Sequence, residues 1–289
     1  METHPTSSLK VAVAQSLCEP GDIEGNLDRM EPLIRSAATQ GARLILFSEA
    51  GITGYESSPG ILDQAVVAGD RTCQRLHTLA RENNLVIAAG FIERNGDAIH
   101  ISHGAFFPDG QHILQRKALT GTVEPQISNF QFGPDERTVF EIDGVRCAIV
   151  ICADTGIPDW RNSLVDQGVQ LLLLPTAGCG PRHLGWQERD LDDPGVLETY
   201  VERAALVVFS KDAILDCRRH RMAMASCNQM ADNGRDYFHP GHSTIVDSTG
   251  ELVGLIPGSF IFEHLRPRVV VGEIHPKLPQ KFHPPEAAA

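Results

Sequence analysis

Three side chains that could together perform acyl transfer lie in or next to predicted strands. Cys152 ends the apolar run 145–152, Glu49 directly follows the apolar residues 44–47, and Lys117 lies in the predicted strand 112–119. A thiol attacks a carbonyl or nitrile carbon only as a thiolate, so it needs a base, and the developing oxyanion needs a positive donor. We therefore interpret Cys152 as a nucleophile, Glu49 as its base and Lys117 as the oxyanion donor.

One carboxylate could serve both halves of such a reaction. After accepting the thiol proton, Glu49 can protonate a leaving amine and then deprotonate the water that cleaves the thioester. A backbone N–H near Ala153 is expected to assist Lys117 in holding the oxyanion. None of these steps requires a cofactor, and none is predicted.

Each of the three residues also has a purely structural interpretation. Free cysteine is among the most buried residue types, so Cys152 could belong to the core. Glu49 could mark the point where a strand reaches the surface, and Lys117 could be a solvated lysine on an edge strand. The occurrence of all three at suitable distances favours the chemical interpretation.

A β-α-β unit is predicted around Cys152. Residues 145–152 are almost all apolar, which is typical of a strand buried on both faces. Pro158 suits the first turn of a helix, Gly168 ends that helix, and the apolar residues 171–174 form the next strand. The two strands should be parallel with a right-handed crossover, which places Cys152 at the strand edge where α/β sheets bind ligands.

The rest of the chain predicts a single domain with a mixed sheet. Helices are expected where apolar residues recur with helical spacing, and strands where short apolar or alternating runs end in turn residues. The predicted helices are 26–40 and 70–83, and the predicted strands are 10–17, 44–47, 85–92, 99–107, 112–119, 244–246, 252–256 and 269–274. We assign residues 1–9 to a disordered leader, 10–275 to the domain and 276–289 to a proline-rich tail.

Composition excludes several classes of function. The formal net charge is −12 over 289 residues, and no basic patch is long enough to suggest nucleic-acid binding. No stretch approaches the roughly 18 apolar residues of a membrane span, and the N-terminus has no signal-like run. Seven scattered cysteines favour a reduced, cytoplasmic protein, and the twelve histidines show no familiar ligand spacing, so no metal site is predicted.

Three segments resemble the motifs of the nitrilase superfamily, the carbon–nitrogen hydrolases. In the order of that family they are FSEAGITGY at 47–55, QRKALTGTVEP at 115–125 and VICADTGIPDW at 150–160. The resemblance extends over most of the predicted domain. It implies an α-β-β-α sandwich of two mixed sheets and a Glu-Lys-Cys triad, which here is Glu49, Lys117 and Cys152.

The resemblance implies further site residues. Glu124 is the candidate for a second glutamate of the family, which would orient Lys117 or the substrate. Asp154 has an alternative role as a turn or helix-capping residue. Substrate contacts are expected from residues that flank the triad, namely Tyr55, Ala153, Asp154 and Thr176.

The chain departs from the family pattern where the pocket should form. Ser48 replaces the usual proline before the glutamate, and Ala153 and Gly156 replace residues that are common after the cysteine. The chain also has an apparent insertion between Pro175 and Asn228. The sequence therefore identifies the nucleophile better than the substrate.

The expected reaction is hydrolysis of a small amide or N-carbamoyl compound through a Cys152 thioester, with release of ammonia or an amine. An amide is favoured because nitrilases of the superfamily tend to carry Trp-Glu after the cysteine, where this chain has Ala153 and Asp154. The alternatives are a nitrilase, a non-catalytic binding protein, and a member that passes the acyl group or ammonia onward.

The expected partners are a small-molecule substrate and further copies of the same chain. Members of the family commonly pair through the helix after the cysteine strand and through C-terminal arms. The helix at 159–167 and the proline-rich tail therefore predict a homodimer or a higher homo-oligomer. Nucleic acid and membrane are not expected as partners.

Overall fold

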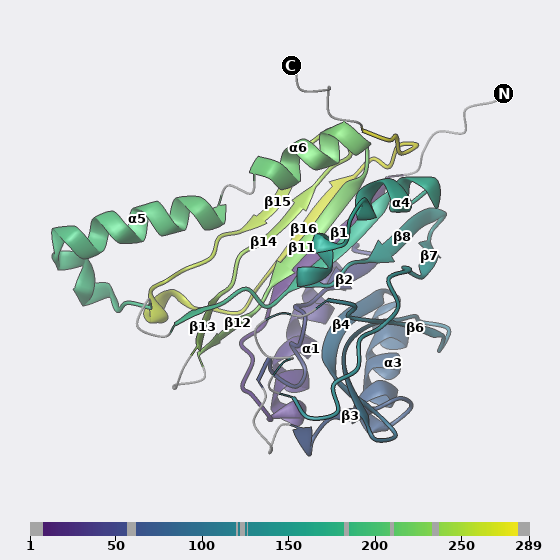
Figure 1. Ribbon diagram of the computed structural model, residues 1–289, viewed down its shortest axis with the longest axis horizontal. Coiled ribbons are helices and arrows are strands. Elements are labelled where there is room, and N and C mark those ends of the chain that lie inside the picture. The colour runs from purple at the N-terminus through teal and green to yellow at the C-terminus, as the bar shows by residue number, and fades with distance from the viewer. Residues whose placement is uncertain are drawn as a thin grey trace.

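Two mixed sheets pack face to face at the centre of the fold (Figure 1). The structure is a computed structural model that describes residues 8–56, 62–119, 121, 125, 127–181, 185–208, 211–232 and 237–282. The first sheet has the strand order β16-β1-β2-β4-β5-β6, with β3 beside β4. Its strands are β1 Leu9–Gln15, β2 Leu44–Leu46, β3 Val66–Val67, β4 Val86–Asn95, β5 Ala98–Phe106, β6 His112–Arg116 and β16 Arg268–Ile274.

The second sheet carries the predicted β-α-β unit. Its order is β15-β14-β11-β9-β8-β7, and β8 and β9 are parallel, as the sequence predicts. The strands are β7 Val139–Ile142, β8 Val145–Ile149, β9 Leu171–Thr176, β11 Ala223–Asn228, β14 Ser243–Val246 and β15 Leu252–Ile256. A smaller third sheet, β10-β13-β12, is formed by β10 Gly180–Pro181, β12 Met230–Asp232 and β13 Tyr237–Pro240.

Helices cover the outer faces of the two main sheets. Helices α1 Ile23–Thr39 and α3 Arg71–Asn83 pack on the first sheet through one apolar cluster, and α4 Trp160–Asp166 and α6 Lys211–His220 pack on the second through another. A third cluster, which contains residues of both sheets, fills the space between them. The predicted α-β-β-α sandwich in a single domain is confirmed.

Several predicted strands end earlier than the sequence pattern suggests. Strand β8 ends at Ile149, because the chain then turns into the short 3₁₀ helix Cys152–Gly156. Strand β6 ends at Arg116, and the carbonyl of Lys117 instead accepts the N–H of Gly133 at 2.7 Å. Lys117 and Cys152 therefore lie just beyond the ends of β6 and β8, where the backbone no longer follows the regular hydrogen-bonding pattern of the sheet.

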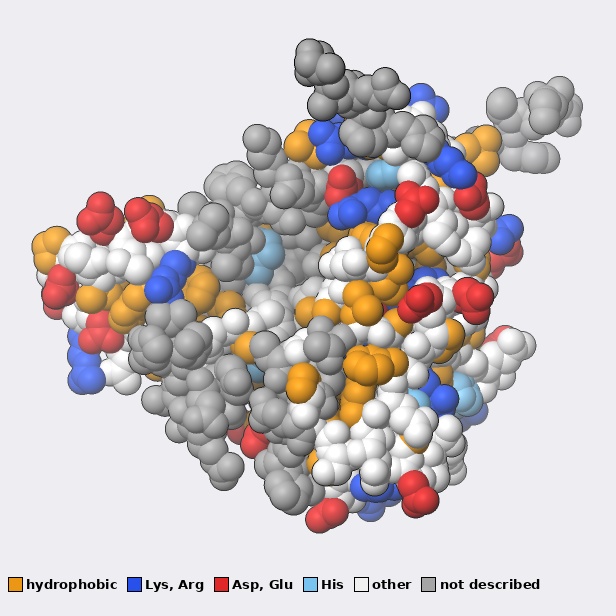
Figure 2. All heavy atoms as spheres, viewed as in Figure 1, with side chains coloured by type: hydrophobic (Ala, Val, Ile, Leu, Met, Phe, Trp, Pro, Cys, Tyr) orange, Lys and Arg blue, Asp and Glu red, His pale blue; other side chains and the backbone are white. Residues whose placement is uncertain are grey.

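The apparent insertion before Asn228 forms the segment that projects from the sandwich. It includes the 3₁₀ helix Glu188–Asp192 and helix α5 Pro194–Val208, which extends away from both sheets (Figure 1). Acidic and hydrophobic side chains gather on this projection (Figure 2). Leu197 and Val201 are exposed on it.

The two ends of the chain differ from the predicted boundaries in detail. Strand β1 begins at Leu9, which is buried, one residue before the predicted domain start, and residues 1–7 lie outside the described part. In the tail, the backbone N–H of Gln280 donates to the carbonyl of His220 at 2.8 Å, and Phe282 packs against Arg219 of α6. Residues 283–289 are not described. Within the described ranges no helix is both long and apolar enough to cross a membrane.

Candidate active site

Glu49, Lys117 and Cys152 meet in one buried cluster. Lys117 Nζ donates to Glu49 Oε1 at 2.5 Å, and neither side chain is exposed. The Cys152 thiol is close enough to Glu49 to share a hydrogen bond with its carboxylate, and it feels the charge of Lys117. The interpretations of Glu49 as surface punctuation and of Lys117 as an exposed edge lysine are therefore wrong.

The sheet topology explains why residues so distant in sequence meet here. Strand β6 is antiparallel to β5, and β5 is antiparallel to β4, which is parallel to β2. Strands β2 and β6 therefore run in the same direction. Glu49 and Lys117, which follow these strands, lie at the same end of the first sheet, next to the carboxyl ends of β2 and β6. Cys152 follows β8 of the facing sheet, and the Glu49 N–H donates to the Thr176 carbonyl of that sheet at 3.4 Å.

Glycine 90 in β4 permits the close approach of the chain that carries Glu49. The N–H of Ile52 donates to the Gly90 carbonyl at 3.0 Å, so the turn after β2 lies directly over β4. A Cβ atom on Gly90 would lie 1.7 Å from the carbonyl oxygen of Glu49 and 2.9 Å from Cδ2 of His103. A glycine inside a strand often marks such a close backbone approach. Gly90 therefore sets the position of the Glu49 backbone.

We expect Gly90→Ala to lower kcat about 100-fold, since a displacement of roughly 1 Å at a catalytic group can have that effect. The measurement is kcat together with the thermal midpoint. Gly156→Ala is the matched control, because the nearest atom to a Cβ there is 3.4 Å away, an ordinary contact. Equal activity of the two folded variants would show that Gly90 does not position Glu49.

Cys152 has an unusual backbone conformation, and its surroundings raise the pKa of its thiol. Cys152 has a positive φ of 46°, which is uncommon for a residue other than glycine and which turns the chain sharply after β8. Burial and then the charge of Glu49 raise the pKa of the Cys152 thiol to about 12, although Lys117 and the Ala177 backbone act in the opposite direction. A nucleophilic role for Cys152 would therefore require the thiol to lose its proton, and the Glu49 carboxylate is the adjacent acceptor.

The Asp154 carboxylate is directed at backbone and side-chain groups of the protein. It is fully buried, and its Oδ1 accepts the N–H groups of Ala118 at 3.0 Å and Leu119 at 2.8 Å. Its Oδ2 lies 3.1 Å from Nη2 of Arg137. Burial raises the pKa of Asp154, while the Arg137 charge and the two N–H donors lower it. Both oxygens thus contact protein groups, and Asp154 does not cap its own 3₁₀ helix.

The other predicted substrate residues surround the cluster. The Tyr55 ring lies 5.3 Å from Lys117 Nζ and makes an edge contact with the ring of His239 at 6.3 Å. Thr176 donates its hydroxyl proton to Asn228 Oδ1 at 3.0 Å. Ala153 is half-buried in the 3₁₀ helix next to the thiol. Glu124 lies outside the described residues.

Three residues near the site were not identified as site residues from the sequence. Arg137 contacts Asp154, His239 contacts Tyr55, and Gln229 accepts a hydrogen bond from Ser48 at 3.4 Å. The adjacent amide residues Asn228 and Gln229, at the end of the apparent insertion, could have pointed to the last of these, but nothing local marks the other two. In the described part of the chain no group of three or more potential metal ligands occurs.

Comparison with known proteins identifies the family to which these motifs belong. The carbon-nitrogen hydrolase family model matches residues 10–192. Nitrilase 3 of Arabidopsis thaliana is 28% identical over 202 residues, which are 63% of this chain and 57% of that protein. N-carbamoylputrescine amidase of Solanum tuberosum is 29% identical over 189 residues, 62% of each chain. The chain thus spans less than two thirds of the length of these relatives.

Solved structures share the fold across nearly the whole chain. A mutant of the amidase from Nesterenkonia AN1, described as belonging to the nitrilase superfamily, superposes with a TM-score of 0.70 and 20% identity. The match covers 93% of this chain and 92% of the other. At this level of identity the likeness concerns the arrangement of the sheets and helices.

Proposed function

The chain belongs to the carbon–nitrogen hydrolase family, and we propose that it hydrolyses a small amide or N-carbamoyl compound through a thioester on Cys152. The observation that carries this proposal is the contact of the Glu49 carboxylate with both the Lys117 ammonium and the Cys152 thiol in a buried cluster. This arrangement offers a nucleophile, a base and a positive donor without a cofactor.

In the proposed reaction the Glu49 carboxylate takes the thiol proton as Cys152 Sγ attacks the substrate carbonyl carbon. Lys117 Nζ stabilises the negative charge that develops on the carbonyl oxygen. The tetrahedral intermediate collapses when Glu49 returns the proton to the nitrogen, so that ammonia or an amine leaves and a thioester remains. Glu49 then deprotonates a water molecule that attacks the thioester, which releases the acid and restores the thiol.

The site supports an amide over a nitrile. An amide nitrogen must be protonated before it leaves, and Glu49 is hydrogen-bonded within the cluster where it can supply that proton. Ala153 follows Cys152 directly, where nitrilases of the superfamily tend to carry the much larger tryptophan. The two named relatives include one called a nitrilase and one called a carbamoylputrescine amidase, so the names alone do not decide between the bonds.

We expect nitriles to be turned over at least about tenfold less efficiently in kcat/KM than amides with the same acyl group, a barrier difference of about 1.4 kcal/mol. The measurement is ammonia release from several such amide and nitrile pairs, with Cys152→Ala as the background. Faster turnover of the nitrile across the pairs would favour a nitrilase.

A catalytically silent binding protein is distinguished by thiol reactivity. Five of the seven cysteines are buried, and Cys152 and Cys179 are the two half-buried ones. A catalytic Cys152 should be labelled by iodoacetamide, which resembles a substrate amide, faster than Cys179. Preferential labelling of Cys179 would favour the binding-protein alternative.

We also propose that the protein is cytoplasmic and forms a homodimer or a higher homo-oligomer. None of the seven cysteines, all of which the structure describes, forms a disulfide, which suits a reducing compartment. Helix α4 and the tail residue Phe282 border a shallow pocket that contains His220 and Trp160, and they are the segments through which the family resemblance implies pairing. Light scattering at micromolar concentration tests this assembly, and a monomeric mass contradicts it.

A further inference from the structure

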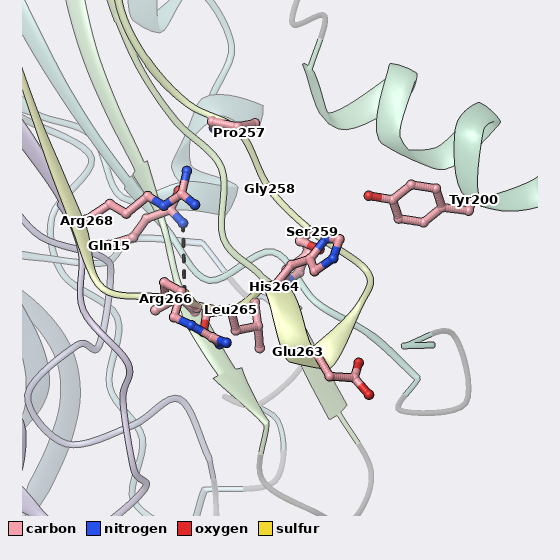
Figure 3. Close-up of a pocket in the computed structure, with 12 residues that line it drawn as sticks. Gln15, Tyr200, Pro257, Gly258, Ser259, Glu263, His264, Leu265, Arg266 and Arg268 are labelled. Carbon is pink, nitrogen blue, oxygen red and sulfur yellow. Dashed lines mark hydrogen bonds between the residues drawn. The ribbon is translucent and has the colours of Figure 1, made fainter. Parts of the chain in front are cut away.

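A second pocket lies on the flank of the molecule, between the end of the first sheet and the projecting helix α5 (Figure 3). Its volume is about 530 Å³, within the range of sites for small organic molecules. Gln15, Met230 and Pro240 are its buried residues, and the loop between β15 and β16 and Tyr200 of α5 form its sides.

Arg266, Arg268 and Gln15 bring a set of hydrogen-bond donors into this pocket. Gln15 and Arg268 are direct partners in the antiparallel pairing of β1 and β16, so their side chains leave the same face of the sheet (Figure 3). Arg266 precedes Arg268 by two residues and also lines the pocket. Among the described residues, no carboxylate lies within ion-pair distance of either guanidinium.

The buried amide of Gln15 is oriented with its donors available. Gln15 is 3% exposed, and its Oε1 accepts the backbone N–H of His242 at 2.8 Å. The Nε2 group, which carries two donor protons, therefore lies on the side of the amide away from the His242 N–H. It donates to the sulfur of Met230 at 4.0 Å, and a thioether sulfur is a weak acceptor. A buried amide N–H₂ with so weak a partner indicates that a better acceptor can bind beside it.

The opposite side of the pocket adds a further donor, and its single carboxylate is already engaged. The hydroxyl of Tyr200 points from α5 toward the pocket (Figure 3). Glu263 lines the rim, but its Oε2 accepts the N–H of Glu188 at 3.1 Å. Of the lining residues with fixed charge, two are arginines and one is this glutamate, although the whole chain has a net charge of −12. The local charge therefore favours an anion.

This pocket is separate from the catalytic cluster. Pro240 lines it, while the preceding residue of β13, His239, contacts Tyr55 of the active site. Successive residues of a strand point to opposite faces, so the strand backbone stands between the two sites. Neither Glu49, Lys117 nor Cys152 lines the flank pocket.

We propose that the flank pocket binds a small organic anion through Arg266, Arg268 and Gln15. The binding group is a carboxylate or a phosphate, since guanidinium groups pair with both through two parallel hydrogen bonds. Such a ligand, held at one end by β1 and β16, would reach Tyr200 at the other and connect α5 to the sandwich.

The test is calorimetric titration of the full chain at low ionic strength with inorganic phosphate in one arm and succinate in the other. We expect saturable binding in at least one arm, and that arm identifies the binding group. Arg268→Gln should weaken it about tenfold or more, because hydrogen bonds to charged groups are among the strongest in proteins. Arg266→Gln, at a second exposed position, should also raise the dissociation constant of the probe.

Two controls make the outcome decisive. Arg71→Gln removes the same charge from a distant, exposed position, and it should leave the dissociation constant unchanged. Cys152→Ala should bind the probe as the unmodified chain does, and this readout does not depend on turnover. Binding in neither arm, binding that survives Arg268→Gln, or equal weakening by Arg71→Gln would each overturn the proposal.

Discussion

Cys152→Ala is expected to abolish amide turnover and to leave the protein folded. The substitution removes only the sulfur, and Cys152 lies half-buried beyond the end of β8 and not in the middle of a packed layer. Without the thiol no thioester can form, so water would have to attack the amide directly. The measurement is ammonia release together with the thermal midpoint of unfolding.

Cys179→Ala is the matched control for the nucleophile. Cys179 is the other half-buried cysteine, and the same atom is removed from it. It should retain most of the turnover, because it is not part of the Glu49–Lys117 cluster in the proposed mechanism. Turnover that persists in folded Cys152→Ala, or that disappears only in Cys179→Ala, would transfer the nucleophile to another residue.

Glu49→Gln is expected to remove nearly all catalysis and also to lower stability, because it leaves the buried Lys117 ammonium without its carboxylate partner. Glutamine has almost the same shape as glutamate, and its side-chain oxygen can still accept a hydrogen bond from Lys117. It cannot take up the proton of Cys152 or return it. General acid–base catalysis contributes on the order of 10²–10⁴ in rate, and Glu49 acts in both half-reactions. The measurements are kcat and the free energy of unfolding in urea.

Lys117→Ala is the informative comparison. Loss of an oxyanion donor should lower kcat by about 10²–10³. It leaves a carboxylate buried without its ammonium partner, just as Glu49→Gln leaves the ammonium without its carboxylate, and breaking a buried pair typically destabilises a protein by about 3–5 kcal/mol. A large loss of activity in both variants, measured at a temperature where each is still folded, is the expected result. If either variant retains near-full kcat, that residue has no part in catalysis.

Local patterns predicted many of the helices and strands, whereas their arrangement in a sandwich of two sheets was implied by the family resemblance. The apolar runs 145–152 and 171–174 predicted parallel strands around a short helix, and the structure contains them as β8, β9 and α4. The errors are at strand ends: β8 stops at Ile149, although residues 150 and 151 are equally apolar. Apolar side chains report burial, which continues past the point where the backbone leaves the sheet.

Reactive residues at strand ends were easier to predict than the residues that support them. The sequence pattern marks Glu49 and Cys152 because they directly follow or end apolar runs. It marks Lys117 because this charged residue lies within a predicted strand. Gly90 and Arg137 do not stand out, because their importance comes from what the fold brings against them. Gly90 of β4 lies against the backbone carbonyl of Glu49, which follows β2. Arg137 forms an ion pair with Asp154, 17 positions later in the chain.

The direction of the Asp154 side chain illustrates the same limit. Its position two residues after Cys152 suggested that it faces the pocket, but the 3₁₀ helix turns its carboxylate toward the N–H groups that follow Lys117. The side-chain direction depends on a backbone turn with positive φ at Cys152. Such a turn is uncommon for a non-glycine residue, so no propensity argument would have predicted it.

The high pKa of the Cys152 thiol also determines how the protein tolerates oxidants between reaction cycles. Peroxides oxidise thiolates to sulfenic acid and then, irreversibly, to sulfinic acid, and they react far more slowly with protonated thiols. Burial and Glu49 raise the pKa of the Cys152 thiol to about 12, which favours the protonated sulfur at neutral pH. In the proposed mechanism the sulfur becomes a strong nucleophile as its proton passes to Glu49 with a substrate in place, which would separate catalytic reactivity from oxidative damage.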